Sequence, residues 1–157
     1  MKLLDILSAV VVVDFVTIIL SKFLHLGKSL DKWYAKFGMT AVLSDCLIIV
    51  LGIQLALLIE PKAGWFHLLM MALIIQVFHD VWFYFGVIQP VPHGQNEIID
   101  LFKEYAQENS WKIVVADSLM VISTVILAET LSNYQESVVT FVGLLGTYAL
   151  TYIIYTK

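Results

Sequence analysis

The chain has 157 residues, of which 60% are hydrophobic and 14% charged, and its mean hydropathy is +0.87. Such a composition is far too apolar for a soluble domain of this length. The net charge of -4 also excludes the basic surface that nucleic-acid binding requires. All nine basic residues are lysines, so bidentate recognition of phosphate or carboxylate by arginine is excluded. We therefore expect an integral membrane protein whose partner is the lipid bilayer and which binds no nucleic acid.

Five apolar runs are long enough, or nearly long enough, to cross about 30 Å of hydrocarbon at roughly 1.5 Å per residue. They are Leu3–Leu20, Thr40–Ile59, Phe66–Ile88, Ile113–Leu131 and Val138–Tyr155. No small-x-small cleavage site follows the first run, so we expect it to be a retained span and not a signal peptide. The sequence predicts one all-α membrane domain over residues 1–157 with five transmembrane helices.

Two of the predicted connections carry apolar residues at helical spacing among frequent charges. They are Leu26–Met39 and Asn96–Trp111, and this pattern is typical of amphipathic helices at a membrane surface. Most lysines lie on the same side as these segments, which favours a cytoplasmic location for that side. We therefore expect the N-terminus outside and the C-terminus in the cytoplasm. Trp33, Trp65 and Trp111 lie near predicted span ends, so we expect interfacial anchors there and no ligand.

An internal repeat is also predicted. The segments 30–35 and 101–106 share the pattern L-x-K-x-Y-A, and one inserted residue later Asp45 matches Asp117. Asp14 and Asp80 then correspond in the preceding spans. The unit would be span, surface helix, span, with repeat 1 at about 1–60, repeat 2 at about 66–131 and an extra helix at about 138–157. Because each unit crosses twice, the copies would be parallel and related by a pseudo-two-fold axis along the membrane normal.

Four aspartates lie inside these apolar spans, where a carboxylate costs a few kcal/mol and normally faces a protein interior or a water-filled cavity. From the predicted boundaries, Asp14 and Asp80 lie roughly 12 Å from the cytoplasmic ends of their spans, and Asp45 and Asp117 roughly 7 Å. Four carboxylates that converge in a poor dielectric cannot all stay ionised. We therefore expect them to share protons or bind a monovalent cation.

The third span adds polar groups to this set. Gln76, Asp80 and Tyr84 recur every four residues with His79 beside them, which gives one stripe with an amide, an acid, a phenol and an imidazole. We expect these groups to assist an ion or proton pathway. The alternative is that each aspartate bonds a hydroxyl or amide of a neighbouring helix and only stabilises packing. No second metal-ligand pair reinforces His79 and Asp80, so neither a metal nor another cofactor is predicted.

Enzyme motifs are missing from the chain. No lysine lies deep in a span to hold retinal, and the sequence contains no P-loop, no Gly-x-Ser-x-Gly elbow and no His-Glu-x-x-His helix. These absences disfavour catalysis. A lipid-modifying enzyme is kept as the third alternative, which would need a lipid-sized pocket that reaches the acids from the bilayer.

The stretch from Phe78 to Leu131, about a third of the chain, carries a set of motifs. They are His79-Asp80-x-x-Phe83-Tyr84, Gln89-Pro90-x-Pro92-x-Gly94-x-Asn96, Ile99-Asp100-x-Phe102-Lys103-x-Tyr105-Ala106 and Ala116-Asp117-Ser118-x-Met120-Val121. In these the chain resembles uncharacterised small polytopic membrane proteins encoded by nucleocytoplasmic large DNA viruses. The resemblance implies a viral membrane protein in the virion's internal membrane or in host membranes, and implies no agreed activity.

The sequence as a whole favours a channel or transporter-like protein that moves protons or monovalent cations through a carboxylate-lined core. Asp14, Asp45, Asp80 and Asp117 would bind or relay the ion, with His79, Gln76 and Tyr84 as auxiliary groups. Five spans scarcely enclose a pore alone, so a homo-oligomer is expected. The alternative is a structural membrane protein, for example of a viral internal membrane, whose buried acids fix helix packing.

Overall fold

The computed structural model describes residues 1–24 and 27–156, and over these residues the chain is helical without any strand. Five helices are long and apolar enough to cross a membrane. They are α1 (Leu3–Leu24), α3 (Met39–Ile59), α4 (Trp65–Phe83) with its continuation η1 (Tyr84–Ile88), α6 (Lys112–Leu131) and α7 (Glu136–Ile153). The prediction of five apolar spans is therefore confirmed, with ends that shift by a few residues.

Two shorter helices, α2 (Lys28–Phe37) and α5 (Glu97–Asn109), fill the connections that the sequence predicts to be surface helices. The predicted start of the first, Leu26, lies outside the described residues. In α2, Trp33 and Tyr34 are buried while Lys32 and Lys36 are exposed. The Asn96 side chain caps α5 by accepting the first free amide N–H groups of that helix.

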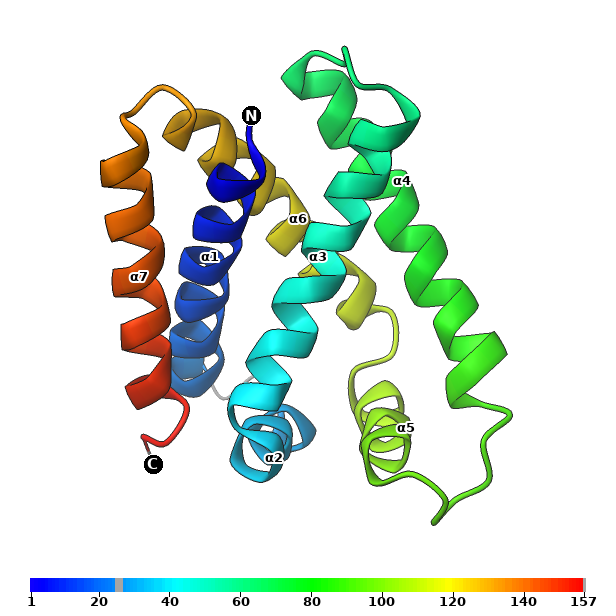
Figure 1. Cartoon of the computed structure of the whole chain (residues 1–157). Coiled ribbons are helices and arrows are strands. Elements are labelled where there is room, and N and C mark those ends of the chain that lie inside the picture. The colour runs from blue at the N-terminus through cyan, green and yellow to red at the C-terminus, as the bar shows by residue number, and fades with distance from the viewer. Residues whose placement is uncertain (25–26, 157) are drawn as a thin grey trace.

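The long helices form a bundle with the two short helices at one end (Figure 1). The C-terminus lies at that same end and the N-terminus at the opposite one, as an odd number of crossings requires. Helix α1 packs on α3 and α6, and α4 packs on the same two helices, while α2 packs on α5. Helix α7 lies along α1, and α4 has no corresponding neighbour.

The contact between α1 and α7 is close because glycines line it. A Cβ atom built on Gly143 would lie 2.5 Å from the Ser8 Oγ, and one built on Gly146 would lie 2.9 Å from Val11. The Ser8 hydroxyl donates to the Val139 carbonyl over 3.0 Å in the gap that the glycines leave. Small residues are the usual means by which membrane helices approach closely, since lipid provides no hydrophobic drive for association.

The two short helices end in the same way. Gly38 follows α2 with φ 53° and ψ -128°, and Ser110 follows α5 with φ 51° and ψ -131°. Each donates its backbone N–H to the helix it ends, Gly38 to Tyr34 and Ser110 to Ala106. A positive φ suits glycine and is strained for serine. These turns direct α3 and α6 back into the bundle.

The outside of the bundle is apolar. Large side chains that point outward from α4 and η1 include Phe66, Ile74, Phe78, Trp82 and Phe85, each more than half exposed. Buried polar groups lie inside, among them the fully buried Asp14 and Thr124. An apolar exterior of this kind is compatible with a chain surrounded by hydrocarbon.

Candidate functional site

The most enclosed of the four aspartates is Asp14, in the middle of α1. Its side chain is 0% exposed. Neither carboxyl oxygen has a hydrogen-bond donor in bonding geometry among the described residues. The Cys46 thiol of α3, a weak donor, lies beside it, and so does the Asp45 carboxylate. A buried oxygen without a donor costs on the order of 1–3 kcal/mol, and more if it is charged.

Asp45 lies near the start of α3 and is bound by two side chains of α2. The Trp33 indole N–H donates to Asp45 Oδ2 over 3.1 Å, and the Tyr34 hydroxyl donates to the same oxygen over 3.2 Å. Both donors are buried, at 5% exposure each. Burial, followed by the nearby Asp45 and Asp14 carboxylates, raises the pKa of the Tyr34 phenol well above 10.0, so that the phenol stays a donor. Helix α2 thus covers Asp45 with the two side chains that bind it.

In the second half, Asp117 occupies the corresponding position at the start of α6. It interacts electrostatically with Asp80 of α4 and with Asp45 of α3. Tyr105 of α5 faces it, and burial together with Asp117 raises the pKa of this phenol. Within the described residues Asp117 accepts no side-chain hydrogen bond, which distinguishes it from Asp45.

Asp80 is bound by its own helix. The Gln76 amide donates to Asp80 Oδ1 over 2.8 Å, and His79 Nδ1 lies 3.3 Å from the same oxygen. The second oxygen, Oδ2, is buried and has no donor among the described residues. The His79 ring stacks on Phe83 with centroids 5.4 Å apart.

The four carboxylates interact electrostatically in pairs. Asp14 interacts with Asp45, Asp45 with Asp117, and Asp117 with Asp80. Gln76 and His79 belong to this set through Asp80. Tyr84 does not, because it lies in η1 and lines a separate cavity with Gln89 and Lys103. The polar stripe expected on the third span is therefore divided. Gln76 and His79 lie at Asp80, whereas Tyr84 lines the separate cavity.

Two functional side chains were missed by sequence reasoning. Trp33 was expected to be an interfacial anchor without a ligand, and this is wrong: the indole is buried and binds Asp45. Tyr34 was noted only as part of the repeated L-x-K-x-Y-A pattern. That pattern was the available signal, since it places a tyrosine eleven or twelve residues before an aspartate in each half.

The short helices that cover the acids are joined by charged groups. Lys32 pairs with Glu104 at 2.7 Å and Lys36 with Glu97 at 3.1 Å. Glu108 accepts the amide N–H groups of Lys28 and Ser29 at the start of α2, over 2.9 and 2.8 Å. Hydrogen bonds from Ser29, followed by that from Lys28, lower the pKa of the Glu108 carboxyl.

This arrangement can hold and pass protons. Carboxyl, phenol, thiol and imidazole groups occur among the interacting residues, and each can donate or accept a proton. In the described part of the chain, no three His, Cys, Asp or Glu side chains come together as possible metal ligands. Comparison with protein families, curated proteins and solved structures finds no match to this chain.

Proposed function

We propose that the protein transports protons through the line of four carboxylates, with monovalent cations as the alternative cargo. The observation that carries the proposal is Asp14, whose two oxygens are buried without a protein donor beside a second carboxylate. A bare anion in that place would be neither solvated nor hydrogen-bonded. A proton or a small cation on the pair removes this penalty.

The neighbours of Asp45 and Asp80 are hydrogen-bond donors and not the oxygen ligands of a metal cation. Asp45 and Asp80 are contacted by donors, namely indole, phenol and amide groups, which stabilise carboxylates one at a time. A monovalent metal cation instead needs several oxygen ligands around one centre. The line Asp14, Asp45, Asp117, Asp80 joins both halves of the bundle, so that a proton that enters at one half can reach the other.

We propose further that the two halves are related by a pseudo-two-fold axis, as the repeat predicts. The reciprocal packing of α1 and α4 on α3 and α6 supports this, and so do the matching turns at Gly38 and Ser110. Lysine placement favours a cytoplasmic location for the end that carries α2 and α5. A homo-oligomer would supply further walls around the acids, because five helices alone enclose little space.

The test is proton flux into liposomes that contain the purified protein and a pH-sensitive dye, driven by a potassium diffusion potential. The protein should acidify or alkalise the lumen faster than empty liposomes do. Replacement Asp14→Asn keeps the shape and removes the titrating group, so flux should fall about 100-fold, as for loss of a proton-transfer group.

The matched control is Asp31→Asn, the same chemical change at an exposed position of α2. It should leave the flux unchanged. Circular dichroism and size-exclusion chromatography establish that each variant folds. Flux equal to that of empty liposomes for a folded wild-type protein, or equal flux from the Asp14 variant, contradicts the proposal.

A structural role is the second candidate, and the bonds from Trp33 and Tyr34 to Asp45 favour it, because they tie α2 to α3. In that case the wild-type protein would conduct nothing, while Asp45→Asn would still weaken folding. The resemblance to viral membrane proteins would then place the protein in a virion or host membrane as an organising component.

A further inference from the structure

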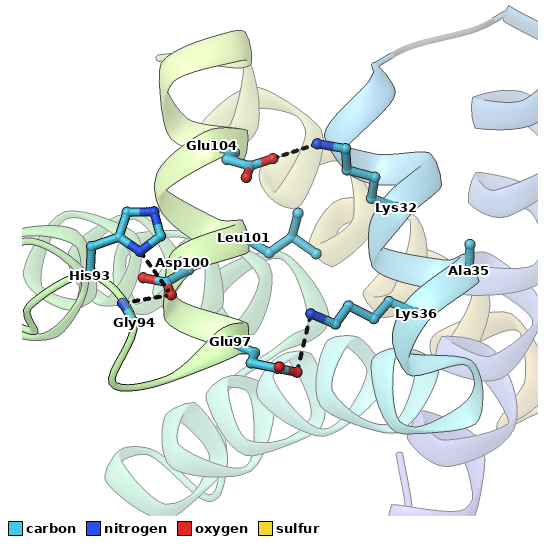
Figure 2. Close-up of a pocket in the computed structure, with 9 residues that line it drawn as sticks. All are labelled: Lys32, Ala35, Lys36, His93, Gly94, Glu97, Asp100, Leu101 and Glu104. Carbon is cyan, nitrogen blue, oxygen red and sulfur yellow. Dashed lines mark hydrogen bonds and ion pairs between the residues drawn. The ribbon is translucent and has the colours of Figure 1, made fainter.

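Two cavities lie at the end of the bundle that carries α2 and α5, and they differ in charge. The larger, of about 680 Å³, lies between α2 and α5 (Figure 2). Two lysines and three carboxylates line it, and each lysine pairs with one carboxylate: Lys32 with Glu104, and Lys36 with Glu97. Asp100 accepts the Gly94 N–H and lies 3.1 Å from His93 Nδ1. A charged ligand would have to displace these pairs.

In the smaller cavity, of about 350 Å³, the lining lysine is not paired with a carboxylate of the described residues. Tyr84, Ile88, Gln89, Lys103 and Gln107 line it, and no carboxylate does. The Lys103 ammonium donates to the Val91 carbonyl. No carboxylate lies within 4.0 Å of this ammonium in the described part of the chain, so its positive charge is not neutralised by an acid. The ammonium keeps further N–H groups for a ligand.

The smaller cavity lies at the edge of the apolar bundle. Tyr84 and Ile88 belong to η1, the last turn of the third span, and Gln89 lies between Ile88 and Pro90. Phe85 of the same turn is 61% exposed on the outside. A π-helical turn widens the backbone, and such turns are frequent at functional sites. The cavity therefore has an apolar wall toward the bilayer and polar groups toward the aqueous end.

We propose that this cavity binds the phosphate group of an anionic phospholipid, with Lys103 as the charged contact. Phosphate oxygens accept hydrogen bonds from an ammonium, from amide NH₂ groups such as those of Gln89 and Gln107, and from the Tyr84 hydroxyl. The volume is at the lower end for small-molecule sites, which suits a head group. The acyl chains would lie along the exposed aromatic face of η1. This site is separate from the carboxylate line and does not depend on proton transport.

The experiment measures lipid retention by native mass spectrometry of the protein released from nanodiscs of equal parts phosphatidylglycerol and phosphatidylcholine. Wild-type protein should retain phosphatidylglycerol preferentially. The variant Lys103→Gln should lower that preference about fivefold, the equivalent of roughly 1 kcal/mol per lysine near a membrane surface. The control Lys112→Gln removes an exposed lysine at the start of α6 and should leave the preference unchanged.

Equal losses from the two lysine variants would show general surface attraction and overturn the proposal. The variant Gln107→Leu keeps the charge and the Lys103–Val91 bond, so it tests the site even where Lys103→Gln fails to fold. It should reduce the preference, and an unchanged preference contradicts the site. Inorganic phosphate added in millimolar excess should not displace the lipid, and full displacement would assign the cavity to free phosphate instead.

Discussion

The segments 1–60 and 66–131 each carry two of the four aspartates in their apolar helices but supply them with hydrogen bonds differently. In the half built from α1, α2 and α3, Asp45 receives two donors and Asp14 none. In the half built from α4, α5 and α6, Asp80 receives donors from its own helix, while Asp117 accepts no side-chain bond within the described residues.

The difference shows that a repeated sequence position does not fix a chemical role. Asp45 is bound because α2 carries an indole and a phenol side by side, whereas α5 carries Glu104 where α2 carries Trp33. Glu104 instead reaches Lys32 at the surface. In each of the two segments, one aspartate accepts a side-chain hydrogen bond and the other accepts none within the described residues.

The largest expected effect is on folding stability when the two acids of the first half are made apolar. Asp45→Val leaves the Trp33 and Tyr34 donors unpaired, so the free energy of unfolding should fall by about 1–3 kcal/mol. Asp14→Val removes a buried carboxyl that no donor satisfies, and stability should rise by about 1 kcal/mol or more. Denaturation in mixed detergent micelles measures both. Effects of the same sign in the two variants would contradict the division into a bound and a free acid.

The matching turns give a smaller effect. Ser110 has φ 51°, where a side chain is strained, so Ser110→Gly should stabilise the fold by about 1 kcal/mol. Gly38→Ala introduces the same strain, and its Cβ would also lie 2.9 Å from the Tyr155 hydroxyl, so it should destabilise the fold. The control is Gly52→Ala, whose Cβ would meet only Ile75 at 3.8 Å. If Ser110→Gly is neutral or destabilising, the two turns are not energetically equivalent.

The smallest effect concerns the starts of the two short helices. The helix α5 is capped by its own Asn96, whereas α2 relies on Glu108 from α5. The pKa of Glu108 is lowered in the folded protein, so its contribution is present above the unfolded value of 4.5 and is lost as pH falls through the folded value. The amide signals of Lys28 and Ser29 should shift in that acidic range by NMR. Glu108→Gln should abolish the shift, while the Ile98 amide at the start of α5 should not follow this titration.

Much of the architecture could be predicted because a bilayer imposes one simple requirement, about 20 apolar residues per crossing. That requirement does not depend on which helices meet, so the spans were found without knowledge of their neighbours. The four aspartates could be predicted as candidate site residues as well, because a charged residue is easily recognised within an apolar segment. The bond from Trp33 to Asp45 was not predictable, because it depends on the angle that the turn at Gly38 sets between α2 and α3.

The packing partner of α7 was equally unpredictable, even though Gly143 and Gly146 are small residues of the kind found at close contacts between membrane helices. Glycines show that some helix approaches, and in lipid the choice of partner depends on the detailed shape of both surfaces. Here the partner is α1, whose Ser8 fills the space over Gly143. The π-helical turn η1, which lies just before Pro90, likewise has no periodic signal of its own in the sequence.

The opposite placement of the chain ends has a practical consequence (Figure 1). A fluorescent protein fused after Thr156 and an epitope fused before Met1 would be separated by the full thickness of the membrane. An antibody added to intact cells could reach one tag only, and a protease added to permeabilised cells would reach both. Such fusions would show on which side of the membrane each chain end lies. For the proposed transport, this would relate the two ends of the bundle to the direction of a proton gradient.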